Sequence, residues 1–303
     1  MIKKILTVLF MLAFLVTGYG CENSEESQGI KVVATLFPQY DFAKAIIGDE
    51  GNVDLLLTPG SDSHSFELTS EDILSINKCD VFIYTGPNME IWVDSIIGSI
   101  DDGVTVLNLS DGIDLKHTEP AELEEHDHVI DPHIWTSPVI AMEMLKKIYN
   151  AICAVDPDNK DVYTDNYNVY LGKLKNLDES FRNLTEDHAY DTLYFSGKFA
   201  FKYFFDEYQL NYYAPFNSCS DLQVEDLASV AYLISEMKER EVKYIFYEEF
   251  ATADAYSTIA RETGAAPLLL HSAHNVSSDD FKNGITYVDL MNNNLINLQK
   301  ALG

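Results

Sequence analysis

The feature that most constrains the fold is an alternation of strand and helix patterns that occurs twice, once on each side of a long amphipathic segment. In the first half, apolar runs at 31–35, 53–57, 81–84 and 104–108 alternate with helical stretches at 39–47, 70–77 and 89–97. The second half repeats the rhythm, with strands at 192–195, 211–213, 244–247 and 267–270 and helices near 199–208, 224–240, 251–263 and 289–301. This alternation predicts an α/β protein with two lobes, each a mainly parallel sheet flanked by helices.

The segment between the halves predicts one amphipathic helix of about 25 residues, because its aromatic and leucine residues recur every three or four positions. These residues are Tyr163, Tyr167, Tyr170, Leu171, Leu174, Leu177, Phe181 and Leu184. No Gly/Ser linker is present, so we expect a rigid connecting helix over 158–187 between an N-terminal lobe at 30–157 and a C-terminal lobe at 188–303. The alternative is that this helix is simply the last helix of the first lobe.

The amino terminus has the pattern of an export signal. Lys3 and Lys4 precede an apolar stretch, 5–16, that is too short to span a bilayer core of about 30 Å. Small residues lead into Cys21, and a polar, acidic run follows, as in bacterial lipoprotein signals. We therefore expect a signal peptide at 1–20, lipidation of Cys21, a tether at 21–29 and a location on the outer face of the cytoplasmic membrane. Cleavage without lipidation is the alternative.

The net charge argues against a nucleic-acid partner. The whole chain carries a formal charge of −29, and loss of the two signal lysines would leave 18 basic residues against 49 acidic ones. So negative a surface repels phosphate and attracts cations. Cys79, Cys153 and Cys219 are far apart and form no C-x-x-C pair, so a structural zinc knot is not expected.

Three histidines follow predicted strands at equivalent ends. His64 comes after the second strand, His133 after the fourth strand and its loop, and His271 directly after the last strand. Ligands of parallel sheets bind beyond the carboxyl ends of the strands, so we expect these imidazoles to converge in the cleft between the lobes. A loop at 116–129 adds three of the eight histidines among several acidic residues. Neutral imidazole is a common ligand of zinc, and the pattern predicts a divalent metal site.

The chain resembles the metal-binding (cluster A-I, zinc/manganese) solute-binding proteins of ABC transporters. The likeness rests on the Pro-Gly-x-x-x-His-Ser-Phe-Glu motif around His64, on Asp131-Pro-His-Ile-Trp135, on the connecting helix and on the carboxyl-terminal tail from Tyr287. The resemblance implies that His64 and His133 are the first two metal ligands. It also implies that His271 stands at the fourth ligand position, where the family usually has Asp.

The sequence departs from the family pattern at the third ligand, where Lys198 occupies the place of a histidine or carboxylate. A protonated ammonium cannot coordinate a cation. We expect Glu248 to supply the missing oxygen, with Glu249, a water molecule, or His126 and His128 as alternatives. Lys198 pairing with one of the two glutamates is the purely structural interpretation. We expect His274 to lie behind the ligands or at the surface.

The ligand set favours zinc, because imidazole suits zinc better than manganese, which prefers oxygen donors. We therefore expect an exported binding protein, not an enzyme, that captures Zn²⁺ as a monomer and delivers it to an ABC permease. Mn²⁺ is the alternative cargo, and the same fold could carry an iron chelate or corrinoid, which Lys198 and Lys202 could contact. An exported zinc hydrolase using Glu67 as base is disfavoured, since the chain lacks H-E-x-x-H and G-x-S-x-G motifs.

Overall fold

The computed structural model describes residues 29–61, 66–117, 130–186, 192–215 and 227–303. The predicted signal, Cys21, His64, His126, His128, His188 and Cys219 lie outside these residues. Within the described ranges, no helix is both long and apolar enough to cross a membrane, and Cys79 and Cys153 are free thiols.

The first lobe contains a four-stranded parallel sheet in the order β2-β1-β3-β4. Its strands are β1 (Ile30–Ala34), β2 (Gly51–Leu55), β3 (Val81–Tyr84) and β4 (Thr105–Asn108). Alternate residues of the central strands face opposite sides: Val32 and Ile83 join the main core, whereas Val33 and Phe82 join a second cluster. Both faces are therefore buried, as predicted for a parallel sheet.

Helices cover the two faces of this sheet. The elements are α2 (Phe37–Ile47), α3 (Ser70–Ile76), α4 (Val93–Ile96), the 3₁₀ turn η2 (Ile97–Ser99) and, after the 3₁₀ turn η3 (Ile134–Thr136), α5 (Pro138–Val155). Helices α2 and α5 contact the strands on one face. Residues of α3 and α4 pack against Phe82 on the other. The helix expected at 89–97 is shorter than predicted, because the Glu90 side chain accepts backbone N–H groups of Thr85 and Gly86 and shapes a turn there.

The second lobe contains two parallel strand pairs, β5 (Thr192–Tyr194) with β6 (Asn211–Tyr213) and β7 (Tyr244–Tyr247) with β8 (Ala266–Leu269). A single parallel bridge between Phe195 and Phe246 joins the pairs. The helices are α7 (Lys202–Glu207), α8 (Leu227–Glu239), α9 (Ala253–Thr263), α10 (Ser278–Lys282) and α11 (Tyr287–Leu302). Helix α7 begins at Lys202, later than the predicted start near 199, and the Ala200 N–H that precedes it donates to Glu248.

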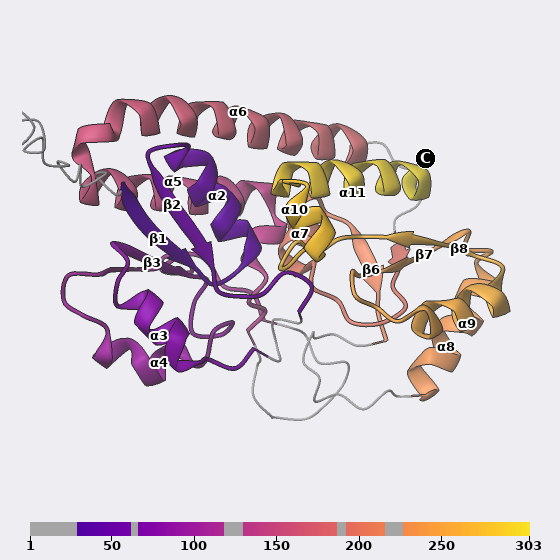
Figure 1. Ribbon diagram of the computed structural model, residues 1–303. Helices are drawn as coiled ribbons and strands as arrows, with labels where there is room; N and C mark the ends of the chain where they lie inside the picture. The colour runs from indigo at the N-terminus through magenta and orange to yellow at the C-terminus, as the bar shows by residue number, and fades with distance from the viewer. Residues whose placement is uncertain (1–28, 62–65, 118–129, 187–191, 216–226) are drawn as a thin grey trace, which may run out of the picture.

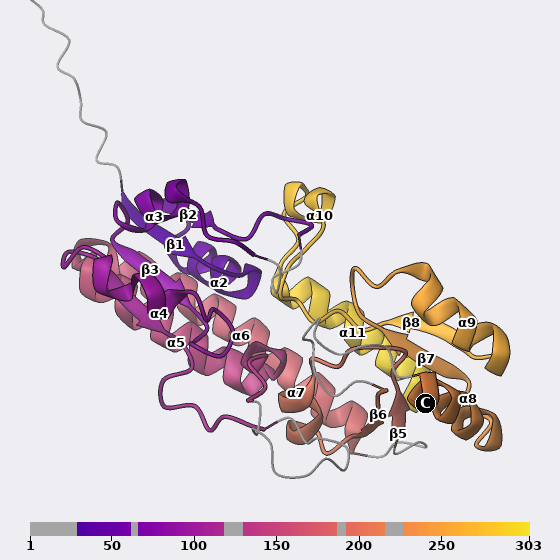
Figure 2. The same ribbon diagram turned by 90° about the horizontal axis from the view of Figure 1, so that it is seen from below.

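The long helix α6 (Lys160–Thr185) follows the 3₁₀ turn η4 (Pro157–Asn159) and has 26 residues. In Figure 1 it runs along the top of the molecule, from the first lobe to α11 of the second, and Figure 2 shows it from below. It packs against α2 and α5 of the first lobe and α11 of the second. Its buried residues are five of those that defined the predicted stripe: Tyr163, Tyr170, Leu174, Leu177 and Phe181. The prediction of one long helix is confirmed.

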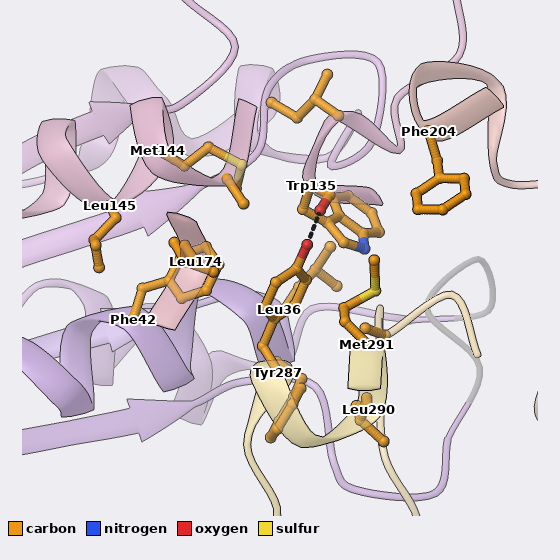
Figure 3. Packing of buried hydrophobic residues seen from close by; sticks show 14 of the residues in the cluster. Leu36, Phe42, Trp135, Met144, Leu145, Leu174, Phe204, Tyr287, Leu290 and Met291 are labelled. Carbon is orange, nitrogen blue, oxygen red and sulfur yellow. Dashed lines mark hydrogen bonds between the residues drawn. The ribbon is translucent and has the colours of Figure 1, made fainter. Parts of the chain in front are cut away.

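One hydrophobic cluster runs through both lobes without interruption. Figure 3 shows its central part, where Trp135 from the first lobe and Tyr287 of α11 lie side by side. The Tyr287 hydroxyl donates to the Trp135 carbonyl oxygen at 2.7 Å, and the Trp135 indole Nε1 donates to the Ser272 carbonyl oxygen at 2.8 Å. Because Trp135 is fully buried, these bonds fix the lobes to each other close to His133 and His271.

Candidate metal centre

The carboxyl ends of the second lobe's strands present their polar residues toward the first lobe. Glu248 and Glu249 directly follow β7, and His271 is separated from β8 only by Leu270. The 271–274 segment reaches the first lobe, because its Ser272 carbonyl accepts the Trp135 indole N–H. Glu248, Glu249 and His271 therefore lie at the carboxyl ends of β7 and β8, on the side of the second lobe that contacts the first.

His133 is held from behind by Asp131. The Asp131 Oδ1 atom lies 2.7 Å from His133 Nδ1 and accepts the His133 backbone N–H at 2.8 Å. Both residues are 2% exposed. With Nδ1 bonded to the carboxylate, Nε2 is the nitrogen oriented for coordination. A carboxylate behind a histidine is the usual second layer of a protein zinc site, where it fixes the ring and increases its basicity.

His274 is the described histidine whose ring lies beside His133. The two ring centroids are 6.2 Å apart and the ring planes cross at 70°. Two imidazoles that share a zinc ion through bonds of about 2.1 Å have centroids roughly 5 Å apart, so the two rings lie about 1 Å farther apart than a shared ion requires. His274 is 6% exposed. It is therefore a buried neighbour of the predicted ligand and not a surface residue.

A left-handed residue shapes the segment that carries His271 and His274. Ala273, between them, has φ of 64°, and its backbone N–H donates to His271 Nδ1 at 3.0 Å. Such a conformation is unusual for a residue with a Cβ and marks a constrained turn. The turn places both rings against the same carboxylate, that of Glu249.

Glu249 contacts both histidines. Its Oε1 lies 3.4 Å from His271 Nδ1 and 3.2 Å from His274 Nδ1, and its side chain is 6% exposed. Burial disfavours its charge, but hydrogen bonds from His274 and Ser272 stabilise the carboxylate, so the pKa of Glu249 is held below its usual range. Burial also lowers the pKa of His271, which favours the neutral ring.

Glu248, the carboxylate that the sequence analysis favoured as a ligand, has different surroundings. Its Oε1 accepts the Ala200 N–H at 2.9 Å. Burial raises the pKa of Glu248 well above its usual range, and the charge of Glu249 adds to the effect, whereas Lys198 opposes it. Lys198 is thus close enough to act on Glu248 electrostatically. As a metal ligand, Glu248 remains a prediction.

The turn that leads to His64 is fixed by the second lobe, although His64 itself lies outside the described residues. The Asn275 amide donates to the carbonyl oxygens of Thr58 at 2.9 Å and Ser61 at 2.6 Å. Asn275 is fully buried and directly follows His274. Among the residues that the structure describes, no three His, Cys, Asp or Glu side chains form a group that could hold a metal ion. His117 is exposed and pairs across its loop with Ile130.

Three supporting residues were not assigned from the sequence. From the sequence, Asp131 is only part of the Asp-Pro-His motif, Glu249 is an alternative ligand to Glu248, and His274 is expected behind the ligands or at the surface. The His-x-x-His spacing of 271–274 was a usable signal, but only the turn at Ala273 shows that both rings face Glu249.

Comparison with known proteins gives consistent results. The chain is 36% identical to the high-affinity zinc uptake system protein ZnuA of Bacillus subtilis, over 98% of this chain and 96% of that protein. It is 30% identical to the zinc-binding lipoprotein AdcA of Streptococcus pneumoniae strain R6, matching with 99% of this chain but only 61% of the longer relative.

Solved structures agree with these sequence relatives. The metal-dependent lipoprotein YcdH of B. subtilis has a TM-score of 0.78 at 35% identity, covering 90% of this chain and 100% of that one. The Zn(II)-bound ZnuA-like domain of S. pneumoniae AdcA has a TM-score of 0.77 at 27% identity, covering 90% and 99%. The family model ZnuA, described as zinc-uptake complex component A, periplasmic, matches residues 32–301. The chain therefore belongs to the ZnuA family.

Proposed function

We propose that this protein captures Zn²⁺ outside the cytoplasmic membrane and delivers it to an ABC permease for uptake, without catalysing a reaction. The proposal rests on the buried contact between His133 and the 271–274 segment, in which the His133 ring lies beside that of His274. A carboxylate contacts the imidazoles of each lobe, namely Asp131 at His133 and Glu249 at His271 and His274. Membership of the ZnuA family and the zinc-binding names of its relatives support zinc as the cargo.

The proposed ligands are His64, His133 and the pair formed by His271 and His274, with Glu248 kept as the predicted oxygen ligand. Imidazole-rich sites favour zinc over manganese, which prefers oxygen donors. Lys198 at the place of a further ligand would leave the ion with fewer protein donors, so an open position is expected unless Glu248 or the loop histidines fill it. Lipidation of Cys21 and a monomeric state belong to the same proposal.

Metal analysis of the purified protein tests this function. The protein is stripped with a chelator, reloaded with zinc and manganese in competition, and assayed by elemental analysis. We expect about one zinc per chain, little manganese, and loss of the zinc in His133→Ala and His64→Ala. The matched control is His117→Ala, which removes an exposed histidine and should retain the zinc. Zinc content unchanged in both His64→Ala and His133→Ala would reject the site, and hydrolytic turnover dependent on Glu67 would favour an enzyme.

A further inference from the structure

The contacts of Glu249 and Ser272 distinguish the two histidines of the 271–274 segment. Ser272 donates its hydroxyl to Glu249 Oε1 at 2.6 Å and its backbone N–H to Glu249 Oε2 at 2.7 Å. Ser272 is fully buried. Its single hydroxyl proton is therefore committed to the carboxylate, and its oxygen is available only as an acceptor.

His274 faces two acceptors through one nitrogen. Its Nδ1 contacts the Ser272 hydroxyl oxygen and lies 3.2 Å from Glu249 Oε1. Neither oxygen has a proton to give, so Nδ1 must carry the hydrogen and donate it. A neutral imidazole with its proton on Nδ1 has its lone pair on Nε2. His274 is consequently set in the form that can bind a metal through Nε2.

His271 is held in the opposite form. Its Nδ1 accepts the backbone N–H of Ala273 at 3.0 Å, so the lone pair lies on Nδ1 and the proton on Nε2. The Nδ1 atom and the Glu249 oxygen 3.4 Å away then carry no hydrogen between them, so this contact is not a hydrogen bond. The His271 backbone is fixed as well, because its N–H and carbonyl both bond to the Asn294 side chain, at 2.7 and 2.8 Å.

We infer that Glu249 and Ser272 form a positioning pair that fixes the tautomer of His274 and thereby selects His274, in preference to His271, as the metal ligand of this segment. The inference rests on the proposed zinc capture and names which of the two histidines performs it. The pair acts behind the ring, as Asp131 does behind His133, so the two lobes would contribute their imidazoles in the same manner.

Nitrogen NMR of the histidine rings tests the inference directly. In the zinc-free protein labelled with ¹⁵N-histidine, His274 should show its proton on Nδ1 and His271 on Nε2, with the signals assigned by their loss in His274→Ala and His271→Ala. On loading with ¹¹³Cd²⁺ as a zinc probe, a nitrogen–cadmium coupling should appear at His274 Nε2. A coupling at His271 and none at His274 would overturn the inference, even in a protein that binds zinc well.

Zinc affinity of variants provides the second measurement. We expect Glu249→Gln and Ser272→Ala each to weaken zinc binding by about 10- to 100-fold. Their double variant should be little weaker than either alone, because they act as one unit. The control is Glu262→Gln, the same change on exposed α9. Unchanged affinity in both single variants would contradict the role of the pair, whereas a wild-type protein without zinc would instead reject the proposed function.

Discussion

At the scale of single residues, the candidate site depends on pairs of side chains and not on the histidines alone. His133 has Asp131 behind it, and His274 has Glu249 and Ser272. The sequence made His133 conspicuous through its Asp-Pro-His motif, but a single sequence contains no signal that a particular acid lies behind a particular ring. The contact between Glu249 and His274 joins the segments that follow β7 and β8, which become neighbours only through the pairing of those strands.

The Asp131 carboxylate offers a direct test of this arrangement. Asp131→Asn keeps the size of the side chain but removes the charge that orients and polarises His133, so zinc affinity should fall by about 10- to 100-fold. Competition with a fluorescent zinc chelator measures the change. Asp114→Asn is the matched control, because the Asp114 side chain is 93% exposed. Equal affinities for Asp131→Asn and the control would show that the carboxylate has no role in binding.

At the scale of elements, the strand and helix periodicities were sufficient for most of the fold. The four strands of the first lobe and the 160–185 helix match the predicted segments closely, because continuous apolar runs and a period of three to four residues are strong local signals. The exceptions lie at the starts of two expected helices. Glu90 folds back onto the N–H of Gly86, and Glu248 accepts the N–H of Ala200 from a distant part of the chain, contacts that the periodicity does not predict.

Three helices meet at a single buried carboxylate. Asp41 of α2 accepts the Tyr170 hydroxyl of α6 and, at 2.9 Å, the Tyr287 backbone N–H at the start of α11. Burial raises the pKa of Asp41 to about 6, and the bonds from Tyr170 and Tyr287 oppose the shift. The junction of both lobes with the long helix therefore contains an acid that ionises nearer neutrality than an exposed aspartate.

This junction predicts a pH dependence of stability. Between its unfolded pKa near 4 and its folded pKa of about 6, Asp41 binds a proton more tightly in the folded state, so its contribution to stability falls as the pH rises through this window. In Asp41→Asn the contribution is absent. The unfolding free energy of the variant relative to wild type should therefore increase by about 3 kcal/mol at most from pH 4 to 7, as measured by urea denaturation. A constant difference across this range would contradict the assignment.

At the scale of the whole molecule, the two lobes share one core. Leu36 and Phe42 of the first lobe, Leu174 of α6 and Leu290 of α11 belong to the same cluster (Figure 3). The sequence predicted the connecting helix but did not show that apolar residues continue across the junction. That continuity depends on Trp135 and Tyr287, which lie far apart in the chain and become neighbours only on folding.

The shared core predicts that the molecule unfolds as one unit. Two independent lobes would give two heat-absorption peaks in calorimetry, whereas a common core should give a single transition whose calorimetric and van't Hoff enthalpies agree. Saturating zinc should move the whole transition upward, by the equivalent of about 2.7 kcal/mol at a free concentration 100 times the dissociation constant. Two resolved peaks, or zinc shifting only part of the transition, would show that the lobes unfold separately.

Because α6 packs against both lobes, the chain could not be split into two independently folding fragments at the start of this helix. A break near Pro157 would leave one fragment without Tyr170 and Leu174 and the other without the α2 and α5 surfaces that cover them. Each fragment would expose a hydrophobic surface, so neither should be soluble by itself. We expect only co-expression of both fragments in the same cell to restore the folded, zinc-binding protein.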